Sequence, residues 1–144
     1  MTPLEKINAL FEEVKAGNNI PANEMFYTLW SNVVLLPKDV SAVVANDIYT
    51  WAENNRDTSP INYARATLTK GFIDFHAGQY KSSLDRCILA QRILEELDDA
   101  DGVAICLVVM GGIYRTLGDV DTAIKYQLEG YRQLSQSGTY PYFE

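Results

Sequence analysis

The chain has 144 residues, the length of one domain, and its hydrophobic and charged fractions of 47% and 22% exclude an intrinsically disordered protein. Its net charge of −7 disfavours nucleic-acid phosphates and anionic lipid as partners. We therefore expect no nucleic-acid partner. No uncharged run approaches the ~20 apolar residues of a membrane span, so we also expect no membrane insertion.

The first predicted element is a leading helix over residues 3–16. Thr2 can cap its N-terminus with Pro3 at the first helical position, and Gly17 can end it. Charged residues interrupt this segment and exclude the apolar core of a signal peptide. We therefore expect an amphipathic helix that is part of the folded domain.

A repeat with a period of forty residues follows, in units over residues 23–62, 63–102 and 103–142. When the chain is shifted by one period, Gly71 falls on Gly111 and Gly78 falls on Gly118, and the apolar positions also coincide. Each unit shows two stretches of helical periodicity. The predicted helices cover residues 22–36 and 39–54, then 60–77 and 80–97, then 102–117 and 120–136.

Turn residues separate the predicted helices. Gly118 suits the left-handed position after a helix, and Asp119 can cap the helix that follows. We expect Asp39 and Asp101 to cap their helices in the same way. The acidic turn before Gly102 lacks the ligand spacing of a calcium loop, so a helix cap explains it better.

Small residues recur where the paired helices must touch. They are Gly71, Ser83, Ala90, Gly111, Ala123 and Gly130. A glycine inside a helix costs roughly 0.5–1 kcal/mol relative to alanine, so we infer that close helix packing offsets this cost. In particular, we predict that Gly111 contacts Ala123 across the last helix pair.

This pattern resembles the tetratricopeptide repeat. That family places small residues, an aromatic and a turn at positions matched here by Gly111, Tyr114, Gly118, Ala123 and Gly130 in the last unit. The middle unit matches less completely, with Gly71, Asp74, Gly78, Ser83 and Ala90, so Asp74 stands where the family has an aromatic. The period of forty exceeds the family's thirty-four and is similar to repeats found ahead of bacterial cyclases, kinases, phosphatases and transcription regulators.

The resemblance implies an all-α, right-handed α–α superhelix of about seven antiparallel helices, forming one domain over residues 1–144. It also implies a non-catalytic sensory or interaction module of a bacterial signalling protein, which binds a protein or peptide ligand in a concave groove. Carried over to this sequence, the groove residues are Asn32, Arg65, Phe72, Phe75, His76 and Arg115. The competing interpretation is that Phe72 and Phe75 pack in the core, the arginines are solvated, and His76 covers the end of its helix. The lysine and asparagine clamp of the family's chaperone-binding members is not matched.

Few residues offer catalytic or metal chemistry. Cys87, Cys106 and His76 are unpaired in sequence and too few for a zinc site, so we expect no metal and no cofactor. Two cysteines without a disulfide framework indicate buried, reduced thiols in a cytoplasmic protein. An alternative function is a small stand-alone hydrolytic enzyme that uses His76 and Asp74.

The C-terminal residues suggest a continuation of the repeats. The register aligns residues 140–144 with the entry into another helix, and helix 120–136 would present Ile124, Leu128 and Tyr131 without a cover. We therefore expect the chain to be the N-terminal part of a longer protein, and the exposed helix to pair with a second copy as a dimer.

Overall fold

The computed structural model describes residues 1–137, and this part of the chain contains seven helices and no strand. They are α1 (Pro3–Lys15), α2 (Ala22–Asn32), α3 (Lys38–Asn54), α4 (Pro60–His76), α5 (Tyr80–Glu96), α6 (Ala100–Thr116) and α7 (Val120–Ser137). Each predicted helix is present. The largest difference is at the end of α2, which stops at Asn32 because residues 33–35 form a turn. The predicted helix entry at residues 140–144 lies outside the described residues.

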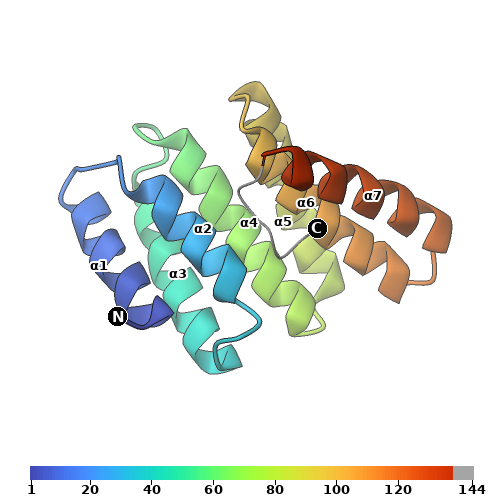
Figure 1. Cartoon of the computed structure of the whole chain (residues 1–144), viewed down its shortest axis with the longest axis horizontal. Helices are drawn as coiled ribbons and strands as arrows, with labels where there is room; N and C mark the ends of the chain where they lie inside the picture. Colours follow the sequence, from blue (N-terminus) through green and yellow to red (C-terminus); the bar gives the residue numbers. More distant parts are fainter. Residues whose placement is uncertain (138–144) are drawn as a thin grey trace.

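The helices form a solenoid of stacked pairs, as predicted (Figure 1). They succeed one another along the long axis from α1 at one end to α7 at the other, with α2 and α4 in front of α3 and α5. Within the pairs, α4 packs on α5 and α6 packs on α7; between the pairs, α3 packs on α4 and α5 packs on α6. Neighbouring pairs therefore share one continuous hydrophobic core, and each pair covers the apolar side of the next.

The small residues bring the backbones of the last two pairs close together. A Cβ atom on Gly111 would lie 3.1 Å from the carbonyl oxygen of Ala123, which confirms the predicted contact. In the middle pair, the Ser83 hydroxyl donates a hydrogen bond of 2.6 Å to the carbonyl oxygen of Gly71. Gly130 lies against α6 as closely, because its Cβ would be 2.9 Å from the carbonyl oxygen of Ala104.

The first pair is built differently. The backbones of α2 and α3 scarcely approach each other, although α2 packs closely on α1. This unit has no glycine at the repeat positions, and the largest fully buried side chains, Trp30 and Phe26, both come from α2. Bulky side chains therefore fill the first pair, whereas close backbone contact holds the other two.

The predicted helix ends are partly confirmed. Thr2 accepts a hydrogen bond of 3.1 Å from the Glu5 N–H, Asp119 accepts one of 3.3 Å from the Thr122 N–H, and Gly118 has a φ of 93°. Two predicted caps are wrong. Pro37 rather than Asp39 precedes α3, and Asp99 rather than Asp101 caps α6.

Candidate functional site

An aromatic cluster lies at the C-terminal end of α4. We use this name for Phe72, Phe75 and His76, in which the His76 ring contacts each phenylalanine ring edge to face. The His76 ring centroid is 4.8 Å from that of Phe72 and 5.1 Å from that of Phe75. Both phenylalanines are half-buried and His76 is exposed. The structure thus brings together three of the six predicted groove residues.

A glycine of α6 lets the aromatic cluster contact the next repeat. A Cβ atom on Gly112 would lie only 3.0 Å from Cζ of Phe75, so the ring rests directly on the α6 backbone. Phe75 also packs on Tyr80 at the start of α5, with ring centroids 6.0 Å apart. The cluster is therefore supported from two neighbouring helices and keeps one side toward solvent.

His76 also borders an apolar depression of about 250 Å³ formed by the α2–α3 connection, the start of α3 and the end of α4. Partial burial, and after it the nearby positive charge of Lys38, lowers the pKa of His76 below its usual 6.5. The imidazole is consequently neutral at pH 7 and keeps one ring N–H as a donor.

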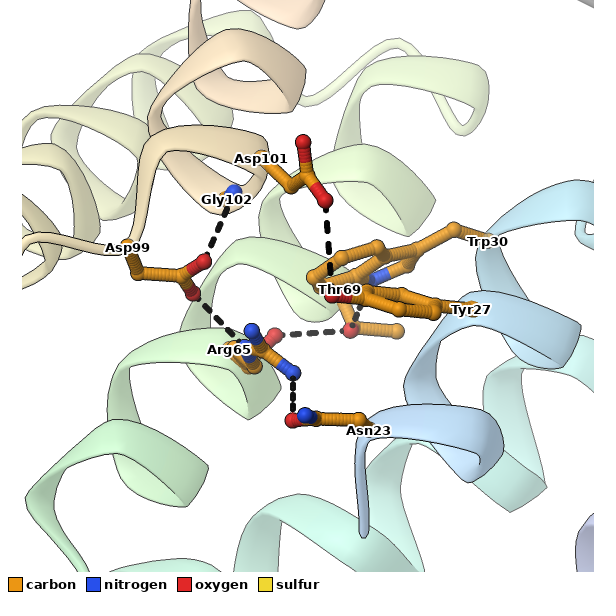
Figure 2. A network of polar contacts seen from close by, with 8 residues as sticks. All are labelled: Asn23, Tyr27, Trp30, Arg65, Thr69, Asp99, Asp101 and Gly102. Carbon is orange, nitrogen blue, oxygen red and sulfur yellow. Dashed lines mark hydrogen bonds and ion pairs between the residues drawn. The ribbon is translucent and has the colours of Figure 1, made fainter. Parts of the chain in front are cut away.

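Arg65 is not in an exposed groove, and this predicted exposure is wrong. Its side chain is buried, with 3% of the residue exposed. The guanidinium donates from Nε to Oδ2 of Asp99 at 2.7 Å and from an Nη atom to Oδ1 of Asn23 at 2.6 Å (Figure 2). It also lies over the rings of Tyr27 and Trp30. Burial lowers the pKa of Arg65, but the hydrogen bond and charge of Asp99 outweigh this and raise it.

The Arg65 contacts belong to a polar network that joins three helices. The Trp30 ring N–H of α2 donates to the Thr69 hydroxyl of α4 at 2.8 Å, and that hydroxyl donates to the Arg65 carbonyl oxygen at 2.8 Å. Asp99 also accepts from the Gly102 N–H at the start of α6. The network sets the relative positions of α2, α4 and α6.

Asn32 and Arg115 lie outside the aromatic cluster. The Asn32 amide donates a hydrogen bond of 2.7 Å to the Thr28 carbonyl oxygen in its own helix. The exposed Arg115 donates to Oε1 of Gln127 on α7 at 2.6 Å, so its guanidinium ties α6 to α7. Both side chains are accessible, Asn32 only in part.

The geometry gives no support to a catalytic pair of His76 and Asp74. The Asp74 carboxylate accepts a hydrogen bond of 2.7 Å from the Ser82 hydroxyl and lies 3.5 Å from Nε of Arg86, both on α5. His76 instead contacts the two phenylalanines and the depression beside Lys38. The two groups therefore belong to different environments.

The two thiols are buried and free. Burial raises the pKa of Cys87 to about 12 and that of Cys106 well above its usual value, so neither is a ready thiolate nucleophile. Within residues 1–137, no three His, Cys, Asp or Glu residues are grouped so that they could hold a metal ion. None of the helices described there is both long and apolar enough to cross a membrane.

The tetratricopeptide repeat family matches residues 62–136, more than half of the chain, so the chain belongs to this family. The match covers the second predicted repeat and most of the third, the two repeats that have a glycine at the same repeat position, Gly71 and Gly111. Repeats of this family generally mediate protein–protein interaction and are typically non-catalytic. No curated protein and no solved structure matches the chain at a significant level.

Proposed function

We propose that the chain is an interaction module that binds a peptide or partner protein over the aromatic cluster of Phe72, Phe75 and His76. The observation that supports this proposal is that two half-buried phenylalanines and an exposed histidine meet at the end of α4, against the backbone of α6. Aromatic side chains that are already held in place offer contact area at low entropic cost, and aromatic residues are enriched at interfaces. Asn32 and Arg115 are proposed as polar contacts at the edges of the same surface.

In this proposal Arg65 is a positioning residue. Its buried guanidinium holds α4 against α2 and α6 through Asn23 and Asp99, and thereby sets the surface that α4 presents. The aromatic ligand contacts come from the C-terminal half of α4, where the side chains reach solvent.

The wider role that we propose is a sensory or scaffolding region of a cytoplasmic bacterial signalling protein. The similarity of its forty-residue repeats to those ahead of bacterial cyclases and kinases supports the signalling context. Two free, buried cysteines agree with a reducing compartment.

We expect Phe72→Ala to weaken binding of a groove ligand at least about fivefold, because truncating an aromatic anchor at an interface commonly costs more than about 1 kcal/mol. The ligand is a peptide selected from a random display library on the whole chain, and its affinity is measured by calorimetry. Tyr49→Ala, which truncates another half-buried aromatic side chain on α3, is the matched control and should leave the affinity unchanged. If selected peptides bind the Phe72→Ala protein as tightly as the unchanged protein, with its melting temperature preserved, this surface is not the binding site.

A second candidate function is self-association through α7. The exposed stripe on this helix consists of Val120, Ile124, Leu128 and Tyr131, with exposed fractions of 51%, 44%, 66% and 36%. The spacing of three to four residues is that of a helix–helix contact. In an antiparallel pair of α7 helices, Ile124 would face Leu128 of the second copy, and Asp121 would lie near its Arg132. An antiparallel pair would thus bring apolar side chains together along the stripe and opposite charges together beside it, which favours a second copy as occupant.

We expect the chain to sediment as a dimer at micromolar concentration and Leu128→Glu to sediment as a monomer, because the substitution places charges on both sides of the two-fold axis. Thr50→Glu on the exposed face of α3 adds the same charge away from the stripe and should remain dimeric. A monomer at all concentrations for the unchanged chain would overturn the pairing.

A further inference from the structure

The depression beside the aromatic cluster has the size of a site for one side chain. Its volume of about 250 Å³ lies below the range of roughly 300–1,000 Å³ that holds cofactors and drug-sized ligands. Its walls are aliphatic and come from Val33 and Leu36 after α2, Ala42 on α3, and Ile73 and Ala77 at the end of α4. An apolar side chain that enters would exchange water for these walls, which is favourable.

The polar groups of the depression favour an anion beside that side chain. Lys38 and His76 line it, and no carboxylate does. Asp39 and Asp47 line a separate depression on the other side of α3, and Asp74 is bonded to Ser82 on α5. In a chain of net charge −7, this depression therefore carries a local positive charge.

The third polar group, Ser41, is already engaged, since its hydroxyl donates a hydrogen bond of 3.1 Å to the Val33 carbonyl oxygen. The neutral imidazole of His76 retains a ring N–H, and the ammonium of Lys38 supplies charge. A carboxylate between the two would receive a charge-assisted hydrogen bond from Lys38 and a second bond from His76.

We propose that this depression receives one apolar side chain of a partner peptide, and that Lys38 and His76 bind the carboxylate of an Asp or Glu next to it. The inference rests on the proposed function and adds to it the sequence class of the ligand, an apolar residue with an acidic neighbour. The aromatic cluster shares His76 with the depression, so the peptide would continue from one onto the other.

The test uses three capped dipeptides, acetyl-Leu-Glu-amide, acetyl-Leu-Gln-amide and acetyl-Ala-Glu-amide. His76 is the sole histidine of the chain, so its imidazole NMR signals report on the depression without ambiguity. We expect acetyl-Leu-Glu-amide to shift these signals with saturation in the millimolar range, and each of the other two to bind at least about fivefold more weakly. Equal binding of the three dipeptides, or no shift, would overturn the proposal. Tighter binding of octanoate than of acetyl-Leu-Glu-amide would also overturn it, in favour of a fatty-acid site.

Variants locate the two parts of the site. Ala42→Phe would fill the depression from an exposed position on α3 and should abolish the shift, and an unchanged melting temperature verifies that the variant folds. Lys38→Gln should equalise the Glu and Gln dipeptides, whereas Lys81→Gln, an exposed lysine on α5, should preserve the difference. Retention of the preference in Lys38→Gln, or of binding in Ala42→Phe, would contradict the assignment.

The library-selected peptides separate this inference from the proposed function. If Phe72→Ala weakens them and Ala42→Phe does not, the depression is not part of the binding surface and the inference fails alone. If Ala42→Phe weakens binding of these peptides and Phe72→Ala does not, the depression is part of the binding surface and the aromatic cluster is not.

Discussion

Replacing Asp99 by alanine is expected to lower the free energy of unfolding by about 3–5 kcal/mol, the cost of breaking a buried ion pair from one side. The substitution would leave the Arg65 guanidinium buried without its counter-charge, since Asp99 is its carboxylate partner at 2.7 Å. It would also remove the hydrogen bond from the Gly102 N–H that caps α6. Chemical denaturation followed by circular dichroism measures the effect.

The matched control is Asp85→Ala, which removes one partner of the exposed ion pair between Lys81 and Asp85. Exposed pairs contribute about 0–1 kcal/mol, so the two substitutions should differ severalfold. The double substitution Arg65→Met and Asp99→Ala should recover part of the loss, because an apolar side chain tolerates burial without a partner. A loss for Asp99→Ala no larger than that for Asp85→Ala would contradict the role of the buried pair.

Substituting Gly111 by leucine is expected to destabilise the chain by about 1–3 kcal/mol through overpacking of α6 against α7. The new Cβ would collide with Cγ of Gln127 and would lie 3.1 Å from the carbonyl oxygen of Ala123. The glutamine can rotate away, but the backbone oxygen moves only if the helices separate. Thermal unfolding measures the effect.

Two further substitutions sharpen this prediction. Gly111→Ala should cost less than Gly111→Leu, because it introduces the short contacts of the Cβ atom alone. Thr116→Leu adds a leucine at an exposed position of the same helix and should change the melting temperature little. A Gly111→Leu protein that melts at the temperature of the unchanged chain would refute close packing at this position.

Local features of the chain were sufficient to predict the helices. Apolar periodicity and the turn residues determine where a helix begins and ends, and both are local signals that span only a few residues. The two glycines at one repeat position also predicted a contact between helices, because a glycine inside a helix is retained only where a backbone comes close. The close approach of Gly111 to the carbonyl oxygen of Ala123 confirmed this prediction.

The aromatic cluster was predictable in part for the same reason. Phe75 and His76 follow Phe72 by three and four residues on one helix, so both lie beside Phe72 on the helix surface. The contact of Phe75 with Gly112 depends on how α4 packs against α6, which the spacing of the three residues does not determine.

The sequence by itself determined the repeat, the helices and the family of this protein, because these depend on patterns repeated along the chain. Only the tertiary structure decided that Arg65 is buried, since its partners come from other segments, Asn23 from α2 and Asp99 from the turn before α6. The Asp99 carboxylate balances a charge that would otherwise stay in water. The depression beside His76 was likewise decided in three dimensions. Its walls come from the α2–α3 connection, the start of α3 and the end of α4. The apolar residues within each segment do not show that the three segments meet, so the depression forms only in the folded chain.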